Sequence, residues 1–375
     1  MWAGIDWVEF LGRRREEVDR GLAGSFASGK SMMITGAGGS IGSGLARSLL
    51  AGRPRTLVLL ELSEGGLYEC YRKITGLGGA SATVVIPVVG SIGDQKLLES
   101  VMRRHGVELV LHAAAYKHVP LMERNPFSAV MNNAVGTSRL VAAACEVGVS
   151  RLTMVSTDKA VNPRSIMGAS KRIAELVLLS HSTDECGMNA VRLGNVLGSS
   201  GSVAPIFCEQ LKLGLPLTVS HPEAMRYFLT PEEAEAAILA AGSSPVSGRI
   251  LVADCGEPRR VVDLARYTGK RSGIGEGIES KMELRVEYVG LRPGDKLCEE
   301  LVAEPEETVV GETRGLRVVD SSHPTRPETI AGIERLATAA GNYELGELLE
   351  VISGLVPSYR PSPALTGESI LLEAL

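Results

Sequence analysis

Short apolar segments alternate with segments of helical periodicity over the first half of the chain. The apolar segments have the length of buried strands. The strand candidates are Met32–Thr35, Thr56–Glu61, Thr83–Val89, Glu108–His112, Arg151–Ser156 and Ala190–Leu193. Amphipathic helices fit between them at Ile41–Leu50, Gln95–His105, Thr137–Val147 and Ser170–Leu179. Because alternating strands and helices form βαβ units, the pattern predicts an α/β fold with a doubly wound parallel sheet.

A glycine-rich string follows the first predicted strand and opens the first predicted helix. It reads Thr35-Gly36-Ala37-Gly38-Gly39-Ser40-Ile41-Gly42. Glycines here permit a tight turn and a close approach of the backbone to a pyrophosphate. The N-terminus of the following helix offers unpaired N–H groups to the phosphates. The string therefore predicts a Rossmann-type dinucleotide site.

An acidic residue ends the second predicted strand. Glu61 lies 19 residues beyond Gly42, where a carboxylate binds the adenosine ribose hydroxyls and repels a 2′-phosphate. No arginine occurs in the turn from Leu62 to Gly66. The sequence therefore favours NAD over NADP, and the alternative is that Glu61 is a solvated strand end.

The regular alternation ends after Leu193 and returns in one further strand at Arg249–Ala253. This change predicts the organisation of the chain. We expect an N-terminal helical arm at 1–30, an NAD-binding Rossmann domain at 31–190 and 226–256, a smaller mixed substrate-binding lobe at 191–225 and 257–355, and a tail at 356–375. Because the tail carries three prolines, we expect most of it to be loosely ordered.

The arm has the spacing of a short amphipathic helix, with apolar residues at Trp2, Ile5, Val8 and Phe10. We expect this helix to pack on its own subunit or on a neighbouring one. Attachment to a membrane surface through the arginines at 13–15 is the weaker alternative, because stable anchoring takes two signals.

The composition and charge of the chain exclude several classes of protein. Of 375 residues, 44% are hydrophobic, and 39 Lys and Arg against 44 Asp and Glu give a net charge of −5, so we expect no nucleic-acid partner. The six cysteines form no CxxC pair and the histidines no HxxxH pair, which predicts reduced thiols and no metal site. No apolar run reaches the ~18 residues of a membrane span. We therefore expect a soluble, cytoplasmic protein.

Three functional side chains end the fifth predicted strand: Thr157, Asp158 and Lys159. The carboxyl ends of strands in an open α/β sheet face the ligand crevice. Lys171 opens the next predicted helix and is placed to reach the nicotinamide ribose. The alternative for Asp158 and Lys159 is an exposed ion pair in a loop.

At these motifs the chain resembles the extended short-chain dehydrogenase/reductases, and among them the nucleotide-sugar 4,6-dehydratases of the capsular polysaccharide and flagellin-glycosylation type. The resemblance runs from about Ser31 to Leu301 in the segments TGAGGSIG, HAAAYKHVPLMERNP, NNAVGT, VSTDKAVNPRSIMGASKR, VRLGNVLGSSGSVAPIF, MRYFLT and LRPGDKLCEEL. It implies an NAD-dependent enzyme that dehydrates a UDP-sugar, above all UDP-N-acetylglucosamine, for surface polysaccharide synthesis. It also implies a homo-oligomer, because short-chain dehydrogenases commonly pair through helices that flank the sheet.

Met167 stands where the superfamily has the tyrosine of its Tyr-x-x-x-Lys pair, and none of the eight tyrosines has a lysine four residues on. A thioether cannot exchange a proton, so Met167 cannot be the base that oxidises an alcohol. The resembling subgroup carries methionine here as well. Thr157, backed by Lys171, is the nearest candidate to replace the tyrosine.

The resemblance implies a closed cycle. Hydride leaves C4 of the sugar for NAD, water is eliminated across C5 and C6, and hydride returns to C6, so that the cofactor stays bound. Asp158 is implied as the acid for the departing 6-hydroxyl and Lys159 as the base at C5. A lysine acts as a base only where burial or a nearby cation lowers its pKa.

The resemblance also implies the ligand contacts. The cofactor-binding residues are expected to be Gly36, Gly38, Gly39, Ser40, Ile41, Gly42, Glu61, Ser91, Ile92, Ala113, Ala114, Ala115, Asn133 and Lys171. The substrate-binding residues are expected to be Lys117, His118, Asn195, Val203, Arg226 and Arg292. The two arginines are expected to face the diphosphate and nucleoside, since arginine binds phosphate through two parallel hydrogen bonds. His118 is equally compatible with a structural role.

Two other functions fit part of the sequence. A nucleotide-sugar epimerase would stop after oxidation or exchange at one carbon, and the Asp158–Lys159 pair argues against it because simple C4 epimerisation needs no elimination acid. A non-catalytic, NAD-binding regulatory protein would bind the cofactor without turnover.

Overall fold

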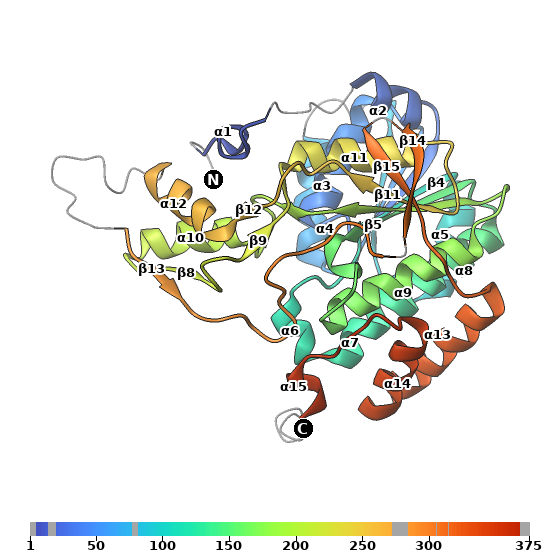
Figure 1. Ribbon diagram of the computed structural model, residues 1–375. Helices are drawn as coiled ribbons and strands as arrows, with labels where there is room; N and C mark the ends of the chain where they lie inside the picture. Colours follow the sequence, from blue (N-terminus) through green and yellow to red (C-terminus); the bar gives the residue numbers. More distant parts are fainter. Residues whose placement is uncertain are drawn as a thin grey trace.

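The computed structural model describes residues 5–13, 20–76, 82–271, 284–304, 306–313 and 315–367. Its centre is a nine-stranded sheet in the order β14-β15-β11-β6-β5-β4-β1-β2-β3 (Figure 1). The parallel strands are β1 (Ser31–Thr35), β2 (Thr56–Glu61), β3 (Val84–Val89), β4 (Leu109–His112), β5 (Arg151–Thr157), β6 (Gly187–Leu193) and β11 (Arg249–Ala253). The predicted α/β class with a doubly wound, Rossmann-type parallel sheet is confirmed.

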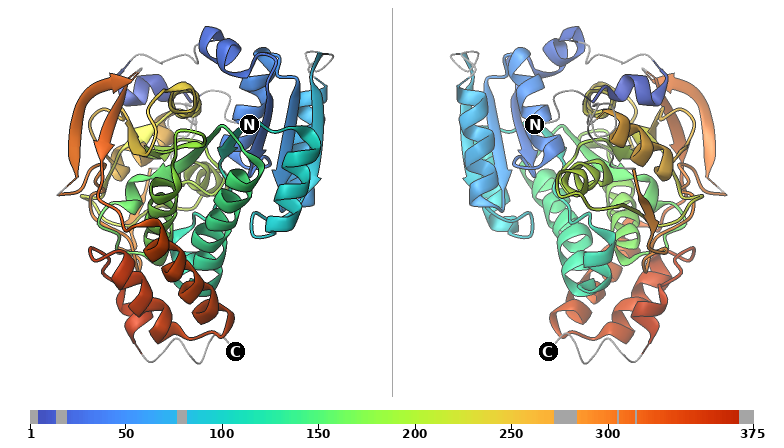
Figure 2. Two further views of the ribbon diagram at one scale, coloured as in Figure 1. Left: turned by 90° about the vertical axis from the view of Figure 1, so that its right-hand side faces the viewer. Right: turned by 90° about the vertical axis from the view of Figure 1, so that its left-hand side faces the viewer.

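Helices cover both faces of this sheet because its strands are apolar on both sides (Figure 2). In β1, Met33 belongs to one hydrophobic core, whereas Met32 and Ile34 belong to the other. The first core is covered by α5 (Gln95–His105), α8 (Gly136–Val147) and α9 (Ile166–His181). The second is covered by α2 (Arg20–Ala27), α3 (Ser40–Ala51), α4 (Glu64–Thr75) and α11 (Pro231–Ser243).

The helix α9 begins four residues before the predicted start at Ser170. Its N-cap is Ser165, whose Oγ accepts a hydrogen bond from the backbone N–H of Gly168 at 3.1 Å. The first turn of the helix is buried, so it lacks the polar positions that mark an amphipathic helix. Met167 and Lys171 consequently lie one turn apart on the same helix.

A smaller lobe lies beside the sheet (Figure 1). It has a separate hydrophobic core, which contains Phe207, Leu217, Phe228 and Leu264. Its elements are β7 (Asn195–Val196), α10 (Val203–Lys212), β8 (Leu217–Val219), β9 (Met225–Arg226), β10 (Phe228–Leu229), β12 (Arg259–Arg260), α12 (Val261–Arg271) and β13 (Val286–Tyr288). The pairs β12–β9 and β13–β8 join segments that precede and follow β11 in the sequence, whereas both strands of the β10–β7 pair precede it.

The expected lobe boundary at 257–355 is wrong. The strands β15 (Leu316–Asp320) and β14 (Glu307–Thr313) extend the main sheet in antiparallel orientation beyond β11. The helices α13 (Arg326–Gly341) and α14 (Leu345–Leu355) bury side chains such as Leu336 and Ile352 in the same core as α9. Apolar side chains on these elements complete the sheet and its helical layer instead of the lobe.

The tail is also more ordered than expected. Val356, Tyr359 and Leu365 are buried, and the last turn is a short helix, α15 (Pro363–Thr366). The Ser362 hydroxyl donates a hydrogen bond to the Glu123 carboxylate at the end of α6 (Val119–Glu123). The prolines therefore turn the chain against the body of the molecule. Residues 368–375 lie outside the described residues.

The arm packs on its own subunit, the first of the alternatives above. The helix α1 (Trp7–Leu11) buries Leu11 in the core of the lobe, and the ring centroids of Phe10 and Tyr267 are 5.4 Å apart. Arg13 follows it and donates to the Glu233 carboxylate of α11 at 2.9 Å. The arm thus contacts both the lobe and the sheet domain. Trp2, Arg14 and Arg15 lie outside the described residues.

Among the helices that the structure describes, none is long and apolar enough to cross a membrane.

Candidate active site

The glycine turn between β1 and α3 has a geometry that only glycine permits at two of its positions. Gly36 has φ +68°, and a Cβ there would lie 2.6 Å from the backbone N of Ala114. A Cβ on Gly42 would lie 2.1 Å from the carbonyl oxygen of Gly36. The N-cap of α3, Gly39, has no side chain to bind the first N–H groups of the helix. This loop is therefore shaped to receive phosphate groups.

Glu61 connects this loop to the next turn. Its carboxylate accepts hydrogen bonds from the backbone N–H of Gly38 at 3.0 Å and of Ser63 at 2.9 Å. It is therefore held at the end of β2, beside the glycine turn. Gly38 and Glu61, two of the expected cofactor residues, are in direct contact.

A pocket of about 660 Å³ lies at the carboxyl ends of β2 and β3. It is lined among others by Leu62, Ser91, Asn132 and Arg139. The expected cofactor residue Ser91 thus faces open space. Ile92, expected beside it, is buried in the hydrophobic core.

Asn133 is buried in a π-helical turn, η2 (Met131–Val135). Its side chain makes two hydrogen bonds to the backbone of Tyr116, at 2.8 and 2.9 Å, and donates to the Ser170 hydroxyl at 3.0 Å. Asn133 therefore links the segment after β4, which includes the expected cofactor residues Ala113–Ala115, to the helix α9.

The Thr157, Asp158 and Lys159 side chains form a connected group at the end of β5. The Thr157 hydroxyl donates to Asp158 Oδ1 at 2.9 Å, and Lys159 Nζ donates to the same oxygen at 3.0 Å. Lys159 also donates to the amide oxygen of Asn195 at 2.9 Å. Asp158 is fully buried, and its Oδ2 has no hydrogen-bond partner among the residues that the structure describes. The alternative that Asp158 belongs to an exposed ion pair in a loop is therefore excluded.

The electrostatics of Lys159 differ from what a base requires. Burial by itself lowers the pKa of Lys159, but the carboxylates of Asp158 and Glu299 raise it, and the net shift is upward. In the absence of ligand, Lys159 is therefore an ammonium ion at neutral pH. The condition that its surroundings lower its pKa is not met in this structure.

Two side chains of α9 lie in contrasting surroundings. Burial lowers the pKa of Lys171 to about 8, and Glu175 only partly offsets this effect. Met167, one turn earlier, is part of the hydrophobic core. Lys171 therefore exchanges protons near neutral pH, whereas Met167 contributes packing.

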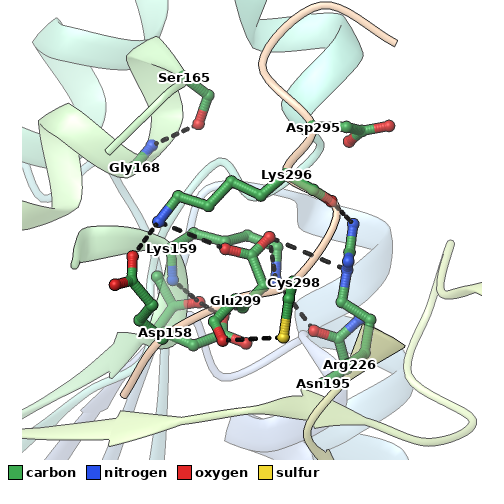
Figure 3. Close-up of polar contacts among 12 residues, drawn as sticks. Asp158, Lys159, Ser165, Gly168, Asn195, Arg226, Asp295, Lys296, Cys298 and Glu299 are labelled. Carbon is green, nitrogen blue, oxygen red and sulfur yellow. Dashed lines mark hydrogen bonds and ion pairs between the residues drawn. The ribbon is translucent and has the colours of Figure 1, made fainter. Parts of the chain in front are cut away.

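The sequence analysis missed Glu299. Its side chain is 3% exposed, and Oε1 lies 3.9 Å from Lys159 Nζ and 3.8 Å from Arg226 Nε (Figure 3). Oε2 lies 3.9 Å from Lys296 Nζ. Burial and the negative charge of Asp158 raise the pKa of Glu299 against the effect of these three cations. The signal was present in the motif LRPGDKLCEEL, from which only Arg292 was selected.

The expected substrate residues divide into three groups. Asn195 and Arg226 join the Lys159 cluster, where the Arg226 guanidinium donates to the carbonyl oxygens of Met225, Lys296 and Leu297. Lys117 donates to Ser199 at 3.4 Å, and the His118 ring packs against Gly201, shortly before Val203 opens α10. Arg292 is 56% exposed and pairs with Asp295 at 2.9 Å. Arg292 makes no contact with the cluster around Lys159 among the contacts of the described residues.

The parallel sheet, the glycine turn after its first strand and the Thr-Asp-Lys group at the end of its fifth strand are typical of an extended short-chain dehydrogenase/reductase. The chain belongs to the family described as "Polysaccharide biosynthesis protein", whose profile matches residues 32–319.

Individual relatives agree with this assignment. The "Capsular polysaccharide biosynthesis protein CapD" of Staphylococcus aureus is 41% identical over 304 residues, which are 80% of this chain and 50% of that protein. A "UDP-glucose 4-epimerase" of Rickettsia rickettsii (strain Sheila Smith) is 31% identical over 287 residues, 74% of this chain and 79% of that protein. The X-ray structure of Pen from Bacillus thuringiensis has a TM-score of 0.72 at 26% identity and covers 80% of this chain and 90% of its own. The chain spans about half the length of the capsular relative.

Proposed function

We propose that this protein dehydrates a UDP-sugar, above all UDP-N-acetylglucosamine, to the 4-keto-6-deoxy sugar for surface polysaccharide synthesis. The observation that carries the proposal is the buried Thr157–Asp158–Lys159 group at the carboxyl end of β5. It places a hydroxyl, a carboxylate and an amine within one hydrogen-bonded unit. An elimination needs an acid and a base side by side, and this unit provides both.

The residues of the glycine turn fit NAD. Gly36 and Gly42 allow a tight turn, because a Cβ at either position would overlap the protein's own backbone, and the uncapped N-terminus of α3 suits a pyrophosphate. Glu61 stands at the end of β2, where it suits ribose hydroxyls and opposes a 2′-phosphate. When bound, NAD would accept hydride from C4 and return it to C6.

The proton transfers of the elimination balance within the Asp158–Lys159 pair. The elimination would begin with a proton shift from the Lys159 ammonium to Asp158 along their 3.0 Å hydrogen bond. Neutral Lys159 would then take the C5 proton, and Asp158 would give its proton to the 6-hydroxyl, which leaves as water, so that the pair regains its ammonium and carboxylate forms. In the oxidation step the proton of the 4-hydroxyl would pass through the Thr157 hydroxyl to neutral Lys171, whose pKa burial lowers to about 8. When hydride returns to C6, the Lys159 ammonium would give a proton to C5, and exchange with solvent would restore both lysines.

The test is proton NMR of the purified protein with UDP-N-acetylglucosamine in deuterated water and no added NAD. We expect a new C6 methyl signal with deuterium at C5, which also requires that the cofactor is already bound. The matched control is Asp158→Asn, which retains the side-chain shape and removes the acid. Conversion to the C4 epimer, or no reaction with NAD and any UDP-hexose, overturns the proposal.

A nucleotide-sugar epimerase is the second candidate, and the similarity to the Rickettsia UDP-glucose 4-epimerase favours it. The same experiment separates the two, because epimerisation changes the configuration of the sugar without forming a methyl group. A non-catalytic NAD-binding protein would give neither product.

A further inference from the structure

Glu299 is a buried carboxylate that lacks the contacts which normally stabilise one. Its three cationic neighbours lie at 3.8 to 3.9 Å, beyond hydrogen-bond distance, and within the described part of the chain its Oε2 has no hydrogen-bond partner. Buried carboxylates in proteins are usually hydrogen-bonded, because the loss of solvation is otherwise uncompensated. A role in stabilising the fold therefore does not explain this side chain.

Another buried carboxylate of the same molecule shows what a stabilising role looks like. Glu175 accepts hydrogen bonds from Arg192 at 2.8 and 2.9 Å and from the Ser156 hydroxyl at 2.6 Å. Both of its oxygens are satisfied. Compared with Glu175, Glu299 makes loose contacts from a position beside the proposed catalytic pair.

The groups that face Lys159 come from four segments. Asp158 precedes it in η3 (Asp158–Ala160), Asn195 comes from β7, and Arg226 comes from β9. Glu299 comes from the segment after β13, which also contributes Lys296 on the far side of the carboxylate. Glu299 is thus the only carboxylate besides Asp158 within 4 Å of Lys159 Nζ in the described residues.

We propose that Glu299 is a positioning residue that holds Lys159 in the ammonium form at Asp158 and so limits how readily Lys159 gives up its proton to become a base. The inference rests on the proposed dehydration, in which neutral Lys159 removes the C5 proton. An opposite charge at about 4 Å favours the charged form of an amine. The pKa of Lys159 is raised in part by Glu299, in agreement with this geometry.

The test compares the pH dependence of kcat and KM in the wild type, Glu299→Gln and the matched control Glu300→Gln. Glu300 is the neighbouring acid, is half exposed and pairs with Lys296 at 3.3 Å. The active Asp158–Lys159 pair holds one proton, which it loses at the pKa of Lys159, so this pKa sets the basic limb of the kcat profile. Removing the Glu299 charge lowers the pKa of Lys159, so the basic limb moves to lower pH, by about 1–3 units. We expect no shift in Glu300→Gln. A Glu299→Gln profile that keeps the wild-type midpoint, including one lowered by the same factor at every pH, overturns the inference.

A second measurement needs no turnover. The lysine side chains are labelled with ¹³C at Cε, the Lys159 signal is assigned by its loss in Lys159→Arg, and the signal is titrated in the ligand-free protein. We expect a lower pKa in Glu299→Gln than in the wild type and an intermediate pKa in Glu299→Asp, whose shorter carboxylate lies farther from Nζ. An unchanged pKa in both variants overturns the inference.

The two measurements also separate this inference from the proposed function. A wild type that dehydrates no UDP-sugar overturns the proposed function, even when the Lys159 titration supports the coupling to Glu299. A wild type that dehydrates while Lys159 titrates alike in all variants overturns only the role of Glu299.

Discussion

Two buried charge clusters lie on either side of the bond between Ser156 and Thr157, and they are built differently. Ser156 donates to Glu175, which Arg192 binds through two hydrogen bonds, and Arg192 also binds Glu306. Thr157 donates to Asp158, whose second oxygen has no hydrogen-bond partner in the described ranges of the chain. The first cluster is closed, whereas the second retains free hydrogen-bonding capacity. The difference indicates which buried charges maintain the fold and which remain available to a ligand.

The largest expected effect is on catalysis. Asp158→Asn preserves an oxygen for the Thr157 hydroxyl but removes the acid, so we expect kcat to fall by about 10²–10⁴-fold. The melting temperature is expected to fall only slightly, because Lys159, which loses the Asp158 carboxylate, is 21% exposed and keeps Asn195 and Glu299 as neighbours. Dehydration assayed by NMR and thermal unfolding on the same sample measure both. A large loss of stability would show that Asp158 maintains the fold, as Glu175 does, and would contradict the distinction between the two clusters.

The closed cluster is expected to show the reverse behaviour. Arg192→Met leaves Glu175 and Glu306 without their shared cation, and breaking such a buried network costs about 3–5 kcal/mol in the free energy of unfolding. Burial by itself raises the pKa of Glu175, but Arg192 and its neighbours lower it to about 2. The wild type is therefore stabilised by this group above its unfolded pKa of 4.5 and loses that contribution as the pH falls toward 2.

Urea unfolding at a series of pH values tests this prediction. We expect the stability of Arg192→Met to depend less on pH between about 4.5 and 2 than that of the wild type. An equally steep acid dependence in both proteins would show that another group is responsible.

Lys171 is expected to combine a functional gain with a structural cost. Burial lowers its pKa from 10.5 to about 8, so the unfolded chain binds the proton more tightly between these values and stability rises with pH across this window. Lys171→Met removes the buried cation, and we expect it to stabilise the ligand-free protein at pH 7 by about 1–2 kcal/mol while abolishing turnover. Unfolding at pH 7 and at pH 10 measures the change, and a destabilised variant would contradict it.

The smallest expected effect lies at the edge of the closed cluster. Arg172 is partly exposed and donates to Glu175 at 2.8 Å and to Ser321. Because Arg192 still satisfies Glu175, Arg172→Gln is expected to cost only about 1 kcal/mol. Chemical unfolding at neutral pH measures it. A loss as large as that of Arg192→Met would mean that the two arginines act as one unit.

The local pattern of apolar and polar residues was sufficient to predict the parallel part of the sheet. The strands at Thr56–Glu61 and Arg249–Ala253 and the helix at Gln95–His105 coincide with the predicted segments. The strands are buried apolar runs with clear polar or glycine boundaries, and the helix has one apolar face. These patterns depend on neighbours in sequence, so they are readable without a structure.

The antiparallel edge and the tail depend on distant partners instead. Val318 pairs with Leu251 on the neighbouring strand. Tyr359 is buried, although a proline lies two residues before it and another two residues after it in the sequence. Nothing near these residues in sequence specifies the surface that covers them. Glu299 was missed for the same reason, because its significance arises only where the fold brings it within 4 Å of Lys159. The motifs identified Asp158 and Lys159, but the balance of charges around Lys159 is a tertiary property.

The contact between the tail and the turn before α9 has a consequence for the order in which the molecule matures during synthesis. Glu123 binds the backbone N–H of Ile166 at 2.7 Å and also the hydroxyl of Ser362, which is 239 residues away in sequence. Arg360 binds the carbonyl of Pro163 at 3.1 Å. The parallel strands, of which the last ends at Ala253, emerge from the ribosome before these partners are made. The turn before Met167 and Lys171 is therefore completed late, only after Ser362 has been synthesised.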